Sequence, residues 1–186
     1  MTFSELSTVG CYKIAEVSSA MQKSIRRGDE DSALFWATEL DLSGYGEYVF
    51  KRLRIISSED IGLAAPGLVT DVHALHENWL AQRKKADTRH GPERLFLVHA
   101  VLLCARAPKS RLVDHALISF YEAPRQHREI PDYALDKHTL RGKQLKRGHA
   151  HFWAQGAKIE NAGAVADPYQ QKAIATRSEL QDELDI

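Results

Sequence analysis

The chain has 186 residues, and its 25 lysine and arginine residues balance 25 aspartate and glutamate residues, so the formal net charge is zero. This length suits one domain that is large enough to bury most of its apolar surface. The neutral balance argues against binding nucleic acid or membrane over the whole surface, but it is compatible with a local basic patch. No apolar run approaches the roughly 20 residues that span a bilayer, and the N-terminus lacks the basic and apolar regions of a signal peptide. We therefore expect a cytoplasmic protein without a membrane partner.

Apolar residues recur at helical spacing in three successive stretches near the start of the chain. The first stretch ends at Arg26-Arg27-Gly28, where cations meet the negative end of a helix and glycine permits the turn. Asp29 or Asp31 can cap a second helix, and Ser43-Gly44-Tyr45-Gly46 breaks it before a third. The three predicted buried faces are Ile14, Val17, Met21 and Ile25; Ala33, Trp36, Ala37 and Leu40; and Val49, Phe50, Leu53 and Ile56.

Three further helices are expected after Pro66, with a polar loop from Lys84 to Pro92 between the first two. Helix after helix with short connections is typical of a bundle. The predicted buried residues are Leu68, Val72, Leu75 and Trp79; Leu95, Val98, His99 and Leu102; and Leu112, Ala116, Phe120 and Tyr121.

The cysteines and histidines of these helices are interpreted as structural residues. Cys11 and Cys104 lie in apolar surroundings and are predicted to be reduced core residues. His73 and His76 are three residues apart and could share a metal ion, but no third ligand stands at a fixed spacing. We expect hydrogen-bonded core or surface histidines instead.

Glu59 and Asp60 are adjacent carboxylates, which invites an acid/base or Mg²⁺ interpretation. Neighbouring residues of a helix point about 100° apart, so the two side chains do not converge on one proton or metal ion without a special turn. We predict instead a structural ion pair with Arg52 or Arg54.

The stretch from Ser19 to Pro66 resembles the region that follows the ATPase core in the RarA/MgsA family of recombination factors, which are relatives of clamp-loader subunits. Ala107-Pro108-Lys109-Ser110 resembles a second landmark of that family. The resemblance covers about residues 15–125 and implies an all-α, clamp-loader-collar-like domain for oligomerisation, commonly as a tetramer, in proteins that act at stalled replication forks. The matching residues of the first stretch are Lys23, Ser24, Arg26, Asp29, Asp31, Ala33, Leu34, Trp36, Arg52, Arg54, Ser58, Glu59, Asp60, Ile61, Gly62, Leu63 and Ala64.

The motor activity of that family has no counterpart in these residues. The sequence contains no G-x-x-x-x-G-K-[ST] phosphate loop and no buried β-branched strands ending in acidic residues that would hold Mg²⁺. We expect no ATP hydrolysis by this polypeptide and no bound cofactor. A separate AAA+ ATPase or a replication-fork protein is a candidate partner.

The pattern changes from Glu122, where helical periodicity gives way to prolines, glycines, cations and histidines. Three interpretations are open. A structural arm could lie over the bundle and help make subunit contacts, burying Leu135, Leu140, Phe152 and Trp153. A nucleic-acid-binding segment could use Arg141, Lys143, Lys146 and Arg147 on phosphates, with an aromatic ring to stack a base. A metal or catalytic site could use Asp136, His138, His149 and His151, because D-x-H and H-x-H place two ligands on one side of an extended strand.

The charged residues after Ala164 are mostly acidic, and Asp167-Pro168 can begin a last helix. The complete prediction is one all-α domain over residues 1–186, with a helical bundle at 11–121, an irregular basic arm at 122–163 and a C-terminal helix or tail at 164–186. We expect a non-enzymatic, homo-oligomeric assembly domain in DNA replication, recombination or repair. The alternatives are a nucleic-acid-binding accessory protein that contacts DNA through the basic arm, or a metal-dependent enzyme that uses residues 136–151.

Overall fold

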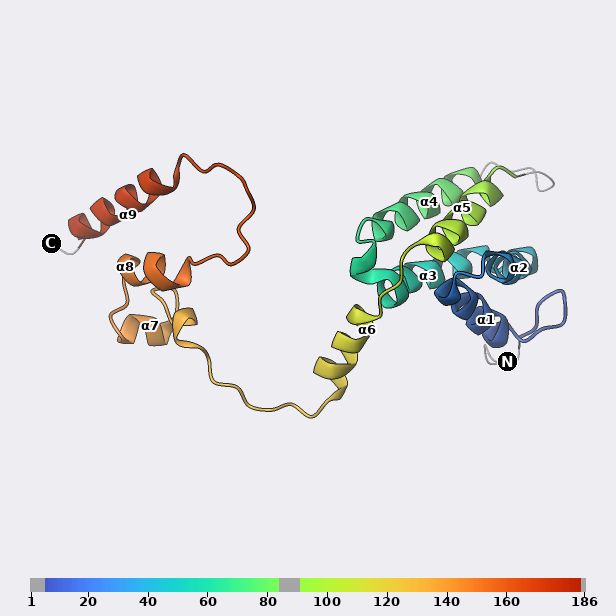
Figure 1. The fold of residues 1–186 in the computed structure, drawn as a ribbon, viewed down its shortest axis with the longest axis horizontal. Coiled ribbons are helices and arrows are strands. Elements are labelled where there is room, and N and C mark those ends of the chain that lie inside the picture. Colours follow the sequence, from blue (N-terminus) through green and yellow to red (C-terminus); the bar gives the residue numbers. More distant parts are fainter. Residues whose placement is uncertain (1–5, 84–90, 185–186) are drawn as a thin grey trace. The chain divides into compact units, whose positions relative to one another are not determined.

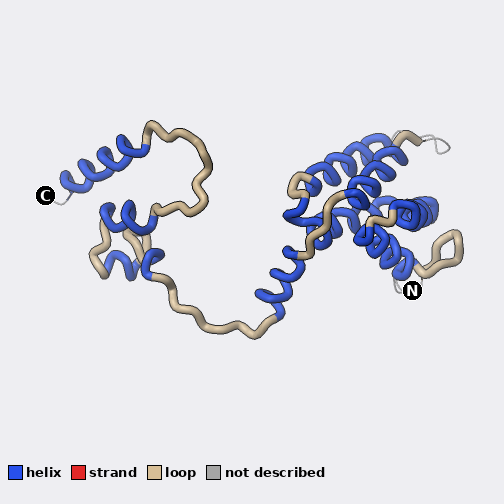
Figure 2. The backbone as a smooth tube through the Cα atoms, in the orientation of Figure 1, coloured by secondary structure: helices blue, strands red, loops and turns tan. Residues whose placement is uncertain are grey.

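The computed structural model describes residues 6–83 and 91–184, with side chains described as far as Arg177. Within these ranges the regular structure is helical, apart from one isolated β-bridge between Ser7 and Lys13 (Figures 1 and 2). The predicted all-α class is therefore confirmed. None of the described helices combines the length and apolar character that crossing a membrane requires.

The chain divides into two compact units, Met1–Arg125 and Gln126–Ile186. The first unit contains α1 (Ile14–Arg27), α2 (Glu30–Leu40), η2 (Asp41–Tyr45), α3 (Gly46–Ile56), η3 (Ser57–Ile61), η4 (Gly62–Ala64), α4 (Leu68–Arg83), α5 (Glu93–Arg106), α6 (Leu112–Leu117) and η5 (Ile118–Glu122).

The first three helices begin and end where the sequence predicts. Gly28 ends α1 with a φ of 72°, and Asp29 caps α2 by accepting the backbone N–H of Ser32 at 3.1 Å. Gly44 allows the break between α2 and α3 with a φ of 85°, a conformation that a side chain would disfavour. All the residues of the three predicted faces are buried, except Trp36, which is partly buried against the core.

Helix α5 lies near the centre of the first unit, because it contacts α1, α2, α3 and α4. The prediction of which side of this helix is buried is wrong, because Leu95 is 71 % exposed and His99 is exposed as well. The helix buries Leu97, Ala100, Val101 and Cys104 instead. Apolar residues occur on every side of α5, so spacing alone does not select the side that faces the core.

The last helical segment of the first unit forms as predicted but is not buried. Helix α6 continues into η5 and extends away from the other helices of this unit (Figure 1). Its predicted core residues Leu112, Phe120 and Tyr121 are 56, 67 and 81 % exposed. The sequence pattern identifies a helix with apolar sides, but the described residues of the first unit do not cover them.

Two structural assignments for single residues also need correction. Cys11 is exposed, so its assignment to the core is wrong. Cys104 is buried as predicted, and this burial raises the pKa of its thiol to about 12. His76 is 4 % exposed, stacks on Phe50 with ring centroids 4.8 Å apart, and has no hydrogen-bond partner for either ring nitrogen among the described residues. It is therefore a core histidine, but not the hydrogen-bonded one that was expected.

The second unit contains η6 (Asp132–Ala134), α7 (Leu140–Gln144), α8 (His149–His151), η7 (Phe152–Gly156) and α9 (Gln170–Leu184). Short helices thus occur within the segment for which an irregular arm was predicted, but loops and turns make up most of it (Figure 2). Of the four apolar residues expected to be buried there, Leu135 is buried, Phe152 and Trp153 are half-buried, and Leu140 is exposed.

Candidate functional site

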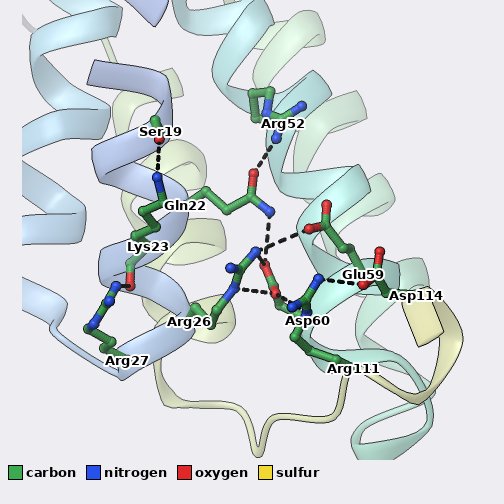
Figure 3. A network of polar contacts seen from close by, with 10 residues as sticks. All are labelled: Ser19, Gln22, Lys23, Arg26, Arg27, Arg52, Glu59, Asp60, Arg111 and Asp114. Atoms are coloured by element: carbon green, nitrogen blue, oxygen red, sulfur yellow. Dashed lines mark hydrogen bonds and ion pairs between the residues drawn. The ribbon is translucent and has the colours of Figure 1, made fainter. Parts of the chain in front are cut away.

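The best-defined polar site of the first unit is centred on the fully buried carboxylate of Asp60 in η3 (Figure 3). Arg26 of α1 donates from Nε to Asp60 Oδ1 at 2.6 Å, and the amide of Gln22 donates to Oδ2 at 3.0 Å. The same guanidinium reaches Glu59 Oε1 at 3.1 Å. A buried carboxylate needs such partners, and the hydrogen bond to Asp60 in turn raises the pKa of Arg26.

The predicted ion pair of Glu59 and Asp60 is therefore present, but its predicted partners are wrong. Arg52 donates to the amide oxygen of Gln22, so it belongs to the network only through that side chain. Arg26 lies 34 positions from Asp60 in the sequence, and no local pattern could have identified it.

The Asp60 site also holds the start of α6. The backbone N–H of Ser110 donates to the carbonyl oxygen of Asp60 at 2.9 Å, and Arg111 Nε lies 3.9 Å from Asp60 Oδ1. Arg111 forms a second ion pair with Asp114, one helical turn along (Figure 3). These contacts fix residues 110–114 on the bundle, while the rest of α6 and η5 projects from it.

The two sequence landmarks that suggested a family meet at this site. Lys109 donates to the carbonyl oxygens of Ala105 and Ala107 at the end of α5, where a cation is favourable, and burial lowers its pKa. Its neighbour Ser110 then contacts Asp60. Both landmarks thus have a structural role, which is to join α1, η3, α5 and α6.

The anchored residues begin an exposed apolar helix over residues 112–122, which we call the α6–η5 helix. Its first residues pack near η3 and η4, but the later ones do not reach the core. Its large exposed side chains are Leu112, Val113, Leu117, Ile118, Phe120 and Tyr121.

One of the four predicted nucleic-acid-binding residues forms hydrogen bonds within the second unit. Arg147 is half-buried and donates to the carboxylate of Asp132 and to the carbonyl oxygens of Asp132 and Leu135. This guanidinium supports the second unit. Arg141, Lys143 and Lys146 are exposed on and just after α7.

The backbone at two of the predicted metal ligands differs from the extended strand that the prediction assumed. His149 and His151 lie in α8, where an i, i+2 pair points to different sides, and not in an extended strand. Asp136 accepts the backbone N–H of His138 at 2.9 Å, and Lys137 Nζ lies 3.0 Å from a ring nitrogen of His149. The described residues contain no group of three or more histidine, cysteine or acidic side chains that could hold a metal ion.

Comparison with known proteins assigns a family to this arrangement. Residues 27–179 match the family model described as the C terminal of the MgsA AAA+ ATPase. The chain is 33 % identical over 139 residues to replication-associated recombination protein A of Bacillus subtilis, which covers 72 % of this chain and 31 % of that protein. The corresponding protein of Escherichia coli K12 is 31 % identical over 169 residues, covering 86 % and 35 %.

A third relative is an uncharacterised AAA domain-containing protein of Mycobacterium tuberculosis, which is 36 % identical over 163 residues, covering 83 % of this chain and 33 % of the relative. The chain thus spans about a third of the length of each curated relative. The matched region is the part that follows the ATPase in the family description, which confirms the resemblance inferred from the two landmarks. The chain belongs to the MgsA AAA+ ATPase C-terminal family.

Proposed function

We propose that this chain is a non-enzymatic oligomerisation domain that assembles a larger complex in DNA replication, recombination or repair. The relatives carry the name replication-associated recombination protein, and the matched family model describes the C-terminal part of an AAA+ ATPase. Both findings support a role in that process. Neither the printed sequence nor the matched region includes a nucleotide-binding loop, so the proposed contribution is assembly.

The exposed α6–η5 helix is the observation that carries this proposal. Its anchored start orients it, whereas Leu117, Ile118, Phe120 and Tyr121 are between 43 and 81 % exposed. A helix that is apolar on several sides is normally covered, and burying one such side chain contributes about 1.5–3 kcal/mol. Aromatic residues are also enriched in the centres of protein interfaces.

The occupant that we propose is the same helix of a second copy of the chain. Most homo-oligomers use two-fold symmetric contacts, in which one patch meets itself, and an apolar helix can satisfy this geometry. The family resemblance suggests four copies. A mixed assembly with an AAA+ relative that carries the equivalent helix would use the same surface.

Light scattering coupled to size-exclusion chromatography tests the proposal on the full chain. We expect a mass that is a multiple of the 20.9 kDa chain, and a monomer for the double variant Phe120→Asp, Tyr121→Asp. The matched control is Leu42→Asp, Leu95→Asp, which places the same two charges at exposed apolar positions elsewhere in the first unit. A monomeric parent chain, or an equal loss of mass in the control, would contradict the proposal.

A further inference from the structure

The α6–η5 helix leaves the first unit at a junction of three contacts, which we call the α6 seat. The backbone N–H of Ser110 donates to the carbonyl oxygen of Asp60 at 2.9 Å. The guanidinium of Arg111 lies beside the carboxylate of the same residue, with Nε 3.9 Å from Oδ1 (Figure 3). The third contact joins Val113 of α6 to Gly62 of η4. Two polar contacts thus hold the start of the helix, and one close apolar contact lies further along it.

Gly62 has a backbone conformation that residues with a side chain rarely adopt. Its φ is 49° and its ψ is −126°, and its N–H donates to the carbonyl oxygen of Ser57 in η3. A positive φ is costly for other residues because it brings Cβ against the backbone. The chain therefore uses glycine where η3 turns into η4, and this turn forms part of the surface on which α6 begins.

The missing side chain of Gly62 also leaves the space that Val113 occupies. A Cβ at position 62 would lie 3.0 Å from Val113 Cγ2 and 3.7 Å from the carbonyl oxygen of Ser110. The first distance is shorter than the optimal carbon–carbon separation of about 3.5–4.0 Å. Valine is β-branched and stiff about χ1 in a helix, so its side chain does not readily turn away. A side chain at position 62 would therefore displace the backbone of α6.

The shape of the helix enlarges such a displacement towards its far end. Arg111, the N-terminal cap of α6, is the pivot, because Asp60 holds both this residue and its neighbour Ser110. At a rise of about 1.5 Å per residue, Val113 lies about 3 Å and Tyr121 about 15 Å along the axis from the pivot. A displacement of about 0.6 Å at Val113 thus becomes about 3 Å at Tyr121.

We propose that Gly62 is a positioning residue for assembly. By admitting Val113, it sets the direction in which the α6–η5 helix leaves the bundle, so that the apolar side chains of η5 meet a second copy at one angle. A helix that is already oriented loses less conformational entropy when it binds. The consequence for assembly rests on the proposed function, whereas the direction of the helix within one copy does not.

Pulsed electron paramagnetic resonance between two spin labels measures this direction in the full chain. The labels are attached at Glu77→Cys on α4 and Glu122→Cys at the end of η5, both of which are exposed, in a Cys11→Ser background. Dilution with unlabelled chain restricts the measured distances to one copy. Gly62→Ala should shift the mean distance by about 2–3 Å or broaden its distribution, because the end of the helix moves.

Two further variants separate the collision from general backbone strain. Gly44→Ala is the matched control, since Gly44 also has a positive φ, of 85°, but no atom lies within 4 Å of the place where its Cβ would be. It should leave the label distance unchanged. Adding Val113→Ala to Gly62→Ala removes the colliding methyl groups and should restore the parent distance. Circular dichroism verifies that each variant is folded.

Sedimentation equilibrium measures the consequence for assembly. Gly62→Ala should weaken self-association about tenfold or more, because losing the burial of one large apolar side chain costs at least that factor. The combination with Val113→Ala should recover most of this loss, and Gly44→Ala should show none of it.

An unchanged label distance in Gly62→Ala, an equal change in Gly44→Ala, or no recovery with Val113→Ala would each overturn the inference. A changed distance with unchanged self-association would also overturn it, because the direction of the helix would then not matter for assembly. A monomeric parent chain would contradict the proposed function alone, since the label distance within one copy still reports whether Gly62 sets the direction.

Discussion

The two units of the chain bury their side chains to very different extents. Within the described residues, the buried apolar side chains belong to the first unit, with the exception of Leu135. The second unit is held by polar contacts, such as those of Arg147 with the η6 region and the cap that Thr139 forms on α7 by accepting the N–H of Gly142 at 3.0 Å. The difference suggests that burial stabilises the first unit and that hydrogen bonds and short helices stabilise the second.

This comparison has a consequence for stability. A cluster of short helices with one buried apolar residue gains little hydrophobic free energy, so it opens at a lower cost than a packed bundle. We expect the two units to lose hydrogen-exchange protection separately, with the second unit opening first. The following predictions test this division, beginning with the largest effect.

The largest effect is expected at Asp60, the buried polar centre of the first unit. Asp60→Asn leaves Arg26 and Arg111 without their shared carboxylate, and we expect a loss of about 2–3 kcal/mol in the free energy of unfolding, since both cations stay partly exposed. Urea unfolding of the first unit measures this change. Glu30→Gln makes the same replacement in the exposed pair with Arg106 and should change the free energy of unfolding far less, because solvent screens that pair. Equal losses in the free energy of unfolding for the two variants would mean that the burial of Asp60 adds nothing to the strength of its ion pairs.

A smaller and local effect is expected at Arg147 in the second unit. Arg147→Ala removes the hydrogen bonds to Asp132 and to the carbonyl of Leu135, so residues around η6 and α7 should open about 1–2 kcal/mol more easily. Hydrogen exchange read by mass spectrometry measures this opening by segment. The exposed Arg141→Ala serves as the control. If protection fell in the first unit as well, the two units would not be energetically separate.

The smallest effect is a pH dependence that should be confined to the first unit. Burial lowers the pKa of His76, so below about pH 6.5 the unfolded chain takes up a proton that the folded core does not. The contribution of His76 to the free energy of unfolding is therefore fully present above that pH. It decreases as the pH falls towards the lowered pKa of the folded state, by at most about 1.4 kcal/mol at pH 5.5.

Urea unfolding of the His76→Leu variant at pH 7.5 and pH 5.5 isolates this contribution, because the variant should lack it. His73 is exposed one helical turn away, and His73→Gln should retain the dependence. A pH dependence that is unchanged in His76→Leu would assign the effect to other groups.

The helices of the first unit differ in how far their packing could be predicted. In α1 and α3 the apolar residues occupy one stripe, so the buried side follows from the spacing, and residues such as Ile14 and Phe50 are buried as expected. In α5 the apolar residues surround the helix, and the spacing placed Leu95 in the core incorrectly. A stripe identifies a direction only when the opposite side is polar.

The candidate sites show the same limit for charged residues. Lys137 and His149 could be recognised as members of a basic, histidine-rich segment, but their contact depends on a chain reversal between α7 and α8. The spacing H-x-H suggested two ligands on one side only because an extended strand was assumed. In α8 the backbone is helical, and this changes the direction of His151 relative to His149.

The amino-acid sequence by itself determined the helical class, the caps at Gly28 and Asp29, and the family, because these depend on local spacing, local backbone preferences and short motifs. Only the tertiary structure decided that Asp60 pairs with Arg26, that the described residues of the first unit leave the α6–η5 helix exposed, and that Trp153 and Arg177 line one groove. These features join residues that are distant in the sequence or depend on what the rest of the chain leaves exposed. No local pattern contains that information, because burial and long-range pairing are properties of the packed chain.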